Sequence, residues 1–297
     1  MNQDDVFQSY KSLLFSIAYR MLGSVMDAED GVQEAYVRWH KAIENGEVVQ
    51  SPKTYLCTIV TRWCIDQLRA VRAQREAYVG VWLPEPLVEP NAPDLAEMAA
   101  SSESLSMAFL LLLEHLSPVE RAVFLLHQVF DYEYGEIAHI VGKSEENCRQ
   151  IARRARQHLK ARRPHYVVPF EQREHLTHQF IRACVSGDMD GLLALLTDDV
   201  VFHSDGGGRV SAVPNPIYGS SRVARLLLGL QRKMVPPGLS TRVAMVNGQP
   251  GFVNYLNGVP NDVVALDIAE GRIREIDLIR NPDKLQHIPL GLLEKGK

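Results

Sequence analysis

The segment 135–160, GEIAHIVGKSEENCRQIARRARQHLK, restricts the fold strongly, because it predicts two short helices joined by a tight turn. Apolar residues recur at helical spacing from Ile137 to Val141, which favours a first helix. Gly142 should end this helix, since a residue without a Cβ enters the left-handed region at little cost. Ser144 is then a suitable N-cap for a second helix. The pattern predicts a helix-turn-helix unit.

The second helix of this unit should have one apolar face and one polar, arginine-rich face. Its predicted buried residues are Cys148, Ile151, Ala152, Ala155 and Leu159. Its predicted DNA-facing residues are Ser144, Asn147, Arg149, Gln150, Arg153, Arg154 and Arg156. Arginine bonds guanine bidentately, and Asn or Gln bonds adenine, so this selection suits a helix that reads the major groove.

The charge distribution agrees with a nucleic-acid surface. Residues 143–163 hold eight Lys or Arg and two Glu, a local charge of +6, whereas the whole chain carries −4. Positive charge that is focused on one segment of an otherwise acidic protein is the electrostatic footprint of a phosphate-binding site. The simpler alternative is a solvated basic face on an ordinary helix pair.

Length and composition narrow the class of protein further. The chain has 297 residues, enough for two or three domains, with 46% hydrophobic and 23% charged residues, as in a soluble globular protein. No apolar run has the length of a membrane span, and the polar start MNQDDVFQSY does not resemble a signal peptide. The four cysteines form no C-x-x-C pair. We therefore expect a cytoplasmic protein with no metal site and no cofactor.

The chain before the helix-turn-helix divides into a helical part and a linker. Residues 1–79 predict three amphipathic helices: one ending near Gly23, one over 27–40, and one starting at Ser51-Pro52, where a cap precedes a proline. Residues 80–104 contain four prolines and predict an extended acidic linker. Helices should resume near Ser104 and end before Pro164.

The remaining part, residues 168–297, has a different pattern. Residues 171–196 predict two helices and 217–234 a third. Period-two alternation then predicts strands over 241–246, 252–255, 263–268 and 273–278. Turn signals separate the strands at Asn247-Gly248, Asn257-Gly258 and Glu270-Gly271. This order predicts an α+β domain in which helices precede an antiparallel meander.

Taken in order, these segments resemble a bacterial sigma factor of the extracytoplasmic-function (ECF) type. DAEDGVQEAYVRWH at 27–40 resembles the part of sigma region 2 that binds the polymerase clamp. SPKTYLCTIVTRWCIDQLRAVRAQRE at 51–76 resembles the part that melts and reads the −10 element. The segment 116–159 resembles region 4, whose helix-turn-helix reads the −35 element. The resemblance implies region 2 at 1–79, the linker at 80–104 and region 4 at 105–163.

The resemblance also implies residue roles and partners. The partners would be promoter DNA and the RNA polymerase core, contacted at its β′ clamp and β flap, with no membrane contact. The polymerase-binding residues would be Asp27, Glu29, Asp30, Gln33 and Glu34. The −10 residues would be Lys53, Arg62, Trp63, Asp66, Arg69 and Arg72. A solvated helix face is the alternative for the acidic set, and core packing is the alternative for Trp63.

Three short motifs resemble the sigma group that carries a SnoaL-like C-terminal domain, whose fold is nuclear-transport-factor-2-like. They are WLPEPL (82–87), DGGGR (205–209) and NPDKL (281–285), with Arg209 where Lys is common. In that group the extension tunes activity in cis, in place of an anti-sigma protein. The expected regulatory contact comprises Trp82, Leu83, Pro84, Glu85, Asp205, Gly206, Gly207, Gly208, Arg209, Asn281, Pro282, Asp283 and Lys284. A plain loop is the alternative for the glycine run.

Two further functions stay open for this chain. One is a stand-alone helix-turn-helix regulator with a ligand-binding or enzymatic C-terminal domain. In the enzymatic case, His203 and Asp205 could form an acid–base pair near Tyr218, Asn254 or Tyr255. We expect no catalysis, because the glycine run follows Asp205 directly. A small-molecule ligand bound without chemistry is the stronger alternative for the C-terminal pocket.

Overall fold

The computed structural model describes residues 3–76, 78–89, 103–160, 168–234 and 236–291. The chain divides into two compact units. The first comprises Met1–Ala77 and Leu110–Arg163, and the second comprises Tyr78–Phe109 and Pro164–Lys297. The segment 80–104, expected to be a linker, therefore belongs to the same unit as the C-terminal domain.

Three long helices form one half of the first unit: α1 (Gln3–Leu22), α2 (Val25–Glu44) and α3 (Pro52–Glu76). Gly23 has a φ of 66° and ends α1 as expected. Ser24 then caps α2, because its hydroxyl accepts a hydrogen bond from the Asp27 backbone N–H at 3.1 Å. These starts and stops agree with the three helices that the sequence predicts.

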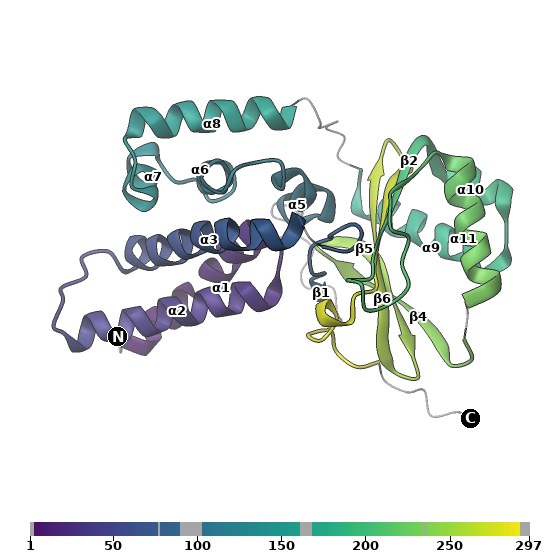
Figure 1. Cartoon of the computed structure of the whole chain (residues 1–297), viewed down its shortest axis with the longest axis horizontal. Helices are drawn as coiled ribbons and strands as arrows, with labels where there is room; N and C mark the ends of the chain where they lie inside the picture. Colours follow the sequence, from purple (N-terminus) through teal and green to yellow (C-terminus); the bar gives the residue numbers. More distant parts are fainter. Residues whose placement is uncertain (1–2, 77, 90–102, 161–167, 235, 292–297) are drawn as a thin grey trace. The chain divides into compact units, whose positions relative to one another are not determined.

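The other half of the first unit holds α6 (Pro118–Gln128), α7 (Tyr134–Val141) and α8 (Glu145–Lys160), while α5 (Met107–Leu113) precedes them. Helices α6 and α7 pack on α3, and α6 also contacts α1 (Figure 1). Arg121 of α6 is buried and donates a hydrogen bond to the Met21 carbonyl oxygen at 2.7 Å. The two sets of helices thus form one body.

The second unit is a sheet with helices on one face. The strand order is β1-β4-β5-β6-β7-β2-β3. The strands are β1 (Val88–Glu89), β2 (Leu196–Asp205), β3 (Ile217–Tyr218), β4 (Leu239–Val246), β5 (Gln249–Leu256), β6 (Val259–Ala269) and β7 (Arg272–Ile279). The helices are α9 (Phe170–Ser186), α10 (Met189–Leu195) and α11 (Ser220–Met234), with 3-10 turns η1 (Glu103–Leu105) and η2 (Pro282–Lys284).

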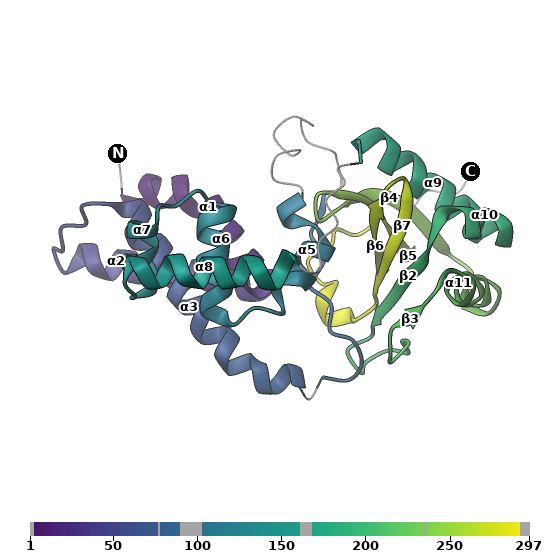
Figure 2. The same cartoon turned by 90° about the horizontal axis from the view of Figure 1, so that it is seen from above.

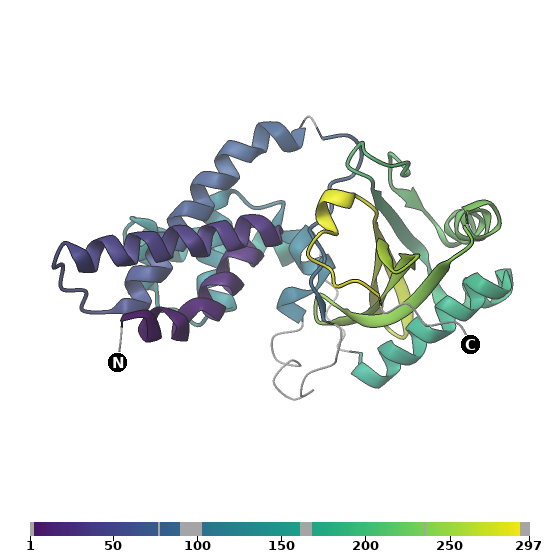
Figure 3. The same cartoon turned by 90° about the horizontal axis from the view of Figure 1, so that it is seen from below.

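The apolar core of this unit lies between the sheet and its helices (Figure 2). Phe180 of α9, Val223 of α11 and Phe202 of β2 are among its most buried side chains. Turn η2 lies on the side of the sheet away from α11 (Figures 1 and 3). The two faces of the sheet therefore have different neighbours, and only one of them meets the helices.

Strands β4 to β7 form the antiparallel meander that the sequence predicts. Its turns begin at Asn247, Asn257 and Glu270, each with a φ of 52° and each followed by a glycine at positive φ. Two such residues in succession give the turn that matches the right-handed twist of a hairpin. These three turn predictions are confirmed.

Other parts of the sheet differ from a pure meander. Strand β2 pairs with β7 in parallel, and β1, from the segment expected to be a linker, pairs with β4. The predicted helix 217–234 begins only at Ser220, because Ile217 and Tyr218 pair with β2. Gly219, with a φ of 92°, separates this short strand from the helix. The sequence pattern of β1, β2 and β3 does not show which strand each of them pairs with.

A packing prediction concerns Gly31 of α2. A Cβ on Gly31 would lie 2.9 Å from the Trp63 ring atoms Cε3 and Cζ3, closer than van der Waals contact. Replacing a helical glycine with alanine usually stabilises by about 0.8–1 kcal/mol, but overpacking costs about 1–3 kcal/mol. We therefore expect Gly31→Ala to lower the melting temperature of the full chain.

The matched control is Gly135 of α7, where an added Cβ would lie 3.8 Å from the nearest atom, a carboxylate oxygen of Glu145. Gly135→Ala should leave the melting temperature unchanged or raise it, as measured by circular dichroism. A melting temperature that rises equally for both variants would contradict the close contact between Gly31 and Trp63.

Candidate nucleic-acid interface and regulatory contact

Helix α8 has the two faces that the sequence predicts. Its five predicted core residues are all buried: Cys148, Ile151, Ala152, Ala155 and Leu159. The preceding helix ends at Gly142, which has a φ of 68°, and the Ser144 hydroxyl accepts the Asn147 backbone N–H at 3.3 Å. The helix-turn-helix geometry is therefore confirmed, whereas the role of each exposed residue stays a prediction.

The polar face of α8 is exposed and partly organised by contacts within the unit. Exposed residues of the predicted set are Ser144, Asn147, Arg149, Gln150, Arg153 and Arg154, and Arg156 is half-buried. Arg149 forms an ion pair with Glu145 and lies 5.5 Å from the centre of the Tyr134 ring. Such surface contacts are weak, so DNA can displace them. Arg153 and Arg154 are exposed one turn further along α8.

The acidic face of α2 is accessible. Glu29, Asp30 and Gln33 are exposed and Asp27 is half-buried, whereas Glu34 forms an ion pair with Arg38 at 2.6 Å. The apolar residues between them point into the helical body. This arrangement is compatible with both a docking surface and a solvated face.

Two residues of the predicted −10 set contact the helices of the helix-turn-helix half instead of standing free. Arg62 donates hydrogen bonds to the carbonyl oxygens of Ile140 at 2.8 Å and His139 at 2.9 Å. Its guanidinium therefore caps the carboxyl end of α7, where the helix dipole favours a cation. The Lys53 ammonium lies 4.8 Å from the centre of the Tyr132 ring.

The other members of the −10 set have different environments. Asp66 and Arg69 are exposed and form an ion pair at 3.1 Å. Trp63 is half-buried and packs its ring edge on Gly31, so the packing role that the sequence left open is present. The side chain of Arg72 lies outside the described residues.

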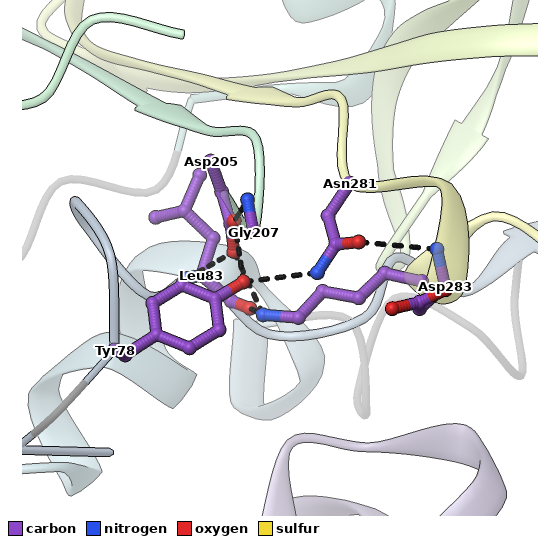
Figure 4. A network of polar contacts seen from close by, with 7 residues as sticks. Tyr78, Leu83, Asp205, Gly207, Asn281 and Asp283 are labelled. Atoms are coloured by element: carbon purple, nitrogen blue, oxygen red, sulfur yellow. Dashed lines mark hydrogen bonds and ion pairs between the residues drawn. The ribbon is translucent and has the colours of Figure 1, made fainter. Parts of the chain in front are cut away.

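The three short motifs meet in the second unit, around the carboxylate of Asp205 (Figure 4). The Tyr78 hydroxyl and the Gly207 N–H donate to one carboxylate oxygen, at 2.7 and 3.0 Å. The Leu83 N–H and the Lys284 ammonium donate to the other, at 2.9 and 2.7 Å. Asp205 is completely buried. The carboxylate joins the linker segment, the glycine loop and η2, and we name this group of contacts the latch.

Lys284 completes the latch from the C-terminal side. Its buried ammonium also donates to the Leu83 carbonyl oxygen, and it lies 4.4 Å from the centre of the Trp82 ring and 5.1 Å from that of Tyr78. Two oxygens and two aromatic faces replace the water that the charge has lost. Burial is the main cause that raises the pKa of Tyr78, and the hydrogen bond to Asp205 raises it further. The phenol therefore keeps its proton and stays a hydrogen-bond donor.

The glycine run is a site of close approach, not a plain loop. Gly207 and Gly208 have φ values of 60° and 69°, which favour glycine. A Cβ on Gly207 would lie 2.3 Å from the Asn281 side chain, and one on Gly206 would lie 2.4 Å from the Val210 carbonyl oxygen. Arg209, by contrast, is exposed and pairs with Asp283 at 3.4 Å.

A second contact ties the linker segment at two places. Asn247, buried in the β4–β5 turn, accepts a hydrogen bond from the Leu87 N–H at 3.1 Å, and its own N–H donates to the Leu87 carbonyl oxygen at 2.8 Å. Its amide nitrogen donates to the Leu105 carbonyl oxygen at 3.1 Å. One side chain thus holds two points of the chain that are 18 positions apart.

The sequence prediction of the regulatory contact omitted Tyr78, Asn247 and His287. The His287 ring bonds the Pro86 carbonyl oxygen at 2.7 Å. None of the three belongs to a recognised motif, and the sequence marks Asn247 only as a turn residue. A buried asparagine that bonds distant backbone has no local signal in a sequence.

His203 and Asp205 do not form the acid–base pair that the sequence left open. His203 lies instead 2.9 Å from Asp277 and 3.0 Å from Glu275, both on the neighbouring strand β7. Both side chains of β2 lie on the sheet face opposite Phe202, whereas the cavity of this unit is lined by Phe202. The carboxylate partners of His203 give no signal in the sequence, because β2 and β7 are distant from each other along the chain.

The His203 cluster is an ion triad. Burial alone would lower the pKa of His203, but the hydrogen bonds and charges of Asp277 and Glu275 raise it to about 10. The nitrogen and oxygen atoms of the three residues lie within 4.8 Å of one another. A protonated imidazole is a donor, not a metal ligand, so the cation that balances these carboxylates is the histidine itself.

The helices of the second unit cover a cavity of about 360 Å³ on the other sheet face. Strands β2, β5, β6 and β7 contribute its floor, and α9 and α11 contribute its walls. Asn254 lines the cavity as expected. Tyr218, by contrast, is 58% exposed at the edge strand β3 and is not among the lining residues.

Known protein families match the two helical halves, and known relatives match nearly the whole chain. Residues 6–74 match sigma-70 region 2, and residues 106–159 match sigma-70 region 4. The chain is 34% identical to the ECF RNA polymerase sigma factor SigJ of Mycobacterium tuberculosis, over 96% of this chain and 93% of that relative. It is 30% identical to the probable ECF sigma factor SigI of the same species, over 96% and 97%. The crystal structure of SigJ superposes with a TM-score of 0.74 at 32% identity, covering 93% of this chain and 97% of that one.

The two sigma-70 regions in this order define a sigma factor, a protein that gives RNA polymerase its promoter specificity and is not an enzyme. The chain belongs to the ECF RNA polymerase sigma factors. Sigma factors bind the polymerase core and promoter DNA, which accounts for two predicted partners. Across the described residues, no helix is both long and apolar enough to cross a membrane.

The His203 triad predicts a pH dependence of stability. Because the folded pKa of His203 is raised from 6.5 to about 10, its contribution is complete below about pH 6.5 and is lost as pH rises to about 10. His203→Gln should therefore destabilise the full chain most near pH 6.5. The difference in free energy of unfolding should narrow toward pH 10, as measured by urea denaturation.

His178, exposed on α9, provides the control, since His178→Gln should give only a small difference in the free energy of unfolding. If the His203→Gln difference is constant from about pH 6.5 to about pH 10, the raised pKa is refuted.

Proposed function

We propose that this sigma factor docks on the polymerase core through the acidic face of α2 and reads the −35 element with α8. Its C-terminal domain then sets the activity of the sigma regions by holding the linker. The carrying observation is that the C-terminal domain bonds the linker segment at Leu83 and Leu87 and the residue that follows the linker, Leu105. The finer polymerase contacts would be the β′ clamp and the β flap.

These bonds shorten the connection between region 2 and region 4. The 17 residues between Leu87 and Leu105 could span up to ~56 Å if extended. In the structure, the side chain of Asn247 bonds both Leu87 and Leu105, so these two residues lie close together. Simultaneous contact with two promoter elements depends on the reach of the connection, so a shortened connection restricts the promoters that can be used.

The helical unit supports a regulated opening. The bonds from Arg62 to the end of α7 occupy a residue that we assign to the −10 element, and the Tyr132 hydroxyl donates to Cys57 at 3.1 Å across the same boundary. Region 2 and region 4 must exchange these contacts for DNA. A domain that holds the linker can bias this exchange by the difference in its contact energy between the two states.

Two further partner assignments belong to this proposal. Regulation by the attached domain would replace a dedicated anti-sigma protein. The cavity of the C-terminal domain would take a small-molecule ligand.

The rival function is a stand-alone helix-turn-helix regulator, and polymerase binding separates the two. The full chain should bind core polymerase in a pull-down and support run-off transcription from a cognate promoter. Reversing the charge of Asp30 on α2 by Asp30→Lys should weaken core binding by about tenfold, whereas Glu171→Lys, an exposed acid of α9, should not. Tight sequence-specific binding to duplex DNA without core binding would support the rival.

The −35 assignment predicts base-specific losses on α8. Arg149→Ala or Arg153→Ala should weaken use of the cognate −35 element by about 1–3 kcal/mol and reduce discrimination against altered elements. Gln157→Ala, an exposed position on the same helix outside the predicted set, should have little effect. An equal loss on every −35 sequence would mean that the arginines contact only phosphate.

Loosening the linker contacts should change the tolerance for promoter spacing. Tyr78→Phe removes one hydrogen bond to Asp205 and the hydroxyl that accepts from Asn281, at a cost of about 1–2 kcal/mol without a large change in shape. Asn247→Gly removes the amide contacts while keeping the turn. The double variant should transcribe from promoters with lengthened or shortened spacers better, relative to the cognate spacer, than the unaltered chain does.

Arg222→Gln is the control for the spacer experiment, because Arg222 is exposed on α11 and belongs to no predicted contact set. It should keep the spacer profile of the unaltered chain. If the double variant and a 1–167 fragment also keep that profile at several salt concentrations, the regulatory role of the C-terminal domain is wrong.

A further inference from the structure

The cavity of the C-terminal unit has an apolar part and a polar part that follow the register of the sheet. Phe252, Val264 and Leu278 form one row across β5, β6 and β7, because Phe252 pairs with Val264 and Val264 with Leu278. Side chains two positions along a strand share a face. The next row on the same face therefore holds polar residues: Thr241, Asn254, Asp262 and Arg280.

The apolar part is closed by helix side chains. Phe180 and Ile181 of α9 and Leu227 and Leu230 of α11 line it opposite the strands. A volume of about 360 Å³ lies at the lower end of the range for small-molecule sites in proteins. An occupant of this part must be largely apolar and compact.

The polar row has a fixed hydrogen-bond direction. The Thr241 hydroxyl donates to the Asn254 side-chain oxygen Oδ1 at 2.6 Å, and the Asn254 side-chain nitrogen Nδ2 donates to Asp262 at 2.6 Å. The Asn261 amide donates to the other Asp262 oxygen at 2.6 Å. Each of these bonds uses one N–H or O–H of the row, and each Asp262 carboxylate oxygen keeps a second lone pair. The row therefore offers acceptors to an occupant.

The charge of the row favours a neutral occupant. Asp262 is 7% exposed, and burial raises its pKa, while the amide bonds and Arg280 lower it. The Arg280 guanidinium donates to the Ser211 carbonyl oxygen at 2.7 Å and balances the carboxylate. An anionic ligand would bring a second negative charge to a buried acid, which is costly.

We propose that this cavity binds a neutral, compact, mainly apolar molecule that donates a hydrogen bond, through a hydroxyl or amino group, to Asp262. The proposal deepens the ligand role assigned above to the C-terminal domain. It is measured by direct binding, so its outcome is distinct from that of the promoter experiments. The His203 triad lies on the opposite face of the sheet and takes no part.

The test uses the full chain and three probes of similar size in isothermal titration calorimetry. 1-Naphthol supplies a donor, 1-methoxynaphthalene lacks it, and 1-naphthoate carries a negative charge. We expect 1-naphthol to bind at least about tenfold more tightly than either of the others. Asp262→Asn should weaken 1-naphthol binding and strengthen 1-naphthoate binding, which a purely structural role of Asp262 would not produce.

A matched pair of variants on α11 locates the site. Leu227 lines the cavity, and its neighbour Leu226 is equally half-buried but does not line it. Leu227→Trp should abolish 1-naphthol binding and Leu226→Trp should preserve it, with both melting temperatures recorded to confirm folding. A dissociation constant above about 1 mM for 1-naphthol, equal binding of the three probes, or unchanged binding by folded Leu227→Trp would each overturn the proposal.

Discussion

The buried pair of Asp205 and Lys284 is the interaction on which the C-terminal unit most depends. Asp205 receives four hydrogen bonds from three separate segments and has no contact with solvent. Loss of one member of such a pair costs about 3–5 kcal/mol, because the other charge stays buried without a partner. The segments that carry the latch must therefore remain together while the unit is folded.

This arrangement explains why the linker segment folds with the C-terminal domain and not with the helices that precede it in sequence. The acidic, proline-rich segment buries the Leu83 side chain completely in this unit. Backbone groups at Leu83 and Leu87 find partners in Asp205, Lys284 and Asn247, and strand β1 adds to the exposed edge of β4. Pairing at that edge also removes unsatisfied strand groups from solvent.

The helical unit shows how one surface can serve two purposes. Arg62 and Lys53 contact α7 and Tyr132 with the same cationic groups that the sigma pattern assigns to the −10 element. Cationic groups that satisfy carbonyl oxygens and aromatic faces in one state are available for phosphates and bases in another. Under the proposed function, the contact between the two regions is built from residues that DNA would also use, so it would be reversible.

The sequence by itself determined the long helices and the hairpin strands of this protein and most of its family-level function. Local signals are strong for the helix-turn-helix, where Gly142 and Ser144 fix the turn, and for the hairpins, where Asn247, Asn257 and Glu270 precede glycines. The motifs containing Asp205 and Lys284 can also be recognised in the sequence, and the two residues meet in the second unit. Such features depend on neighbours within a few positions, which a sequence displays directly.

Only the tertiary structure decided which distant groups meet. The parallel pairing of β2 with β7 gives His203 its carboxylate partners, and the position of the β4–β5 turn brings Asn247 to the carbonyl groups of Leu87 and Leu105. The packing of α3 on α7 turns Arg62 from a free cation into a helix cap. These contacts join residues tens to hundreds of positions apart. Their formation depends on the register and packing of whole elements, which no local pattern of residue types specifies.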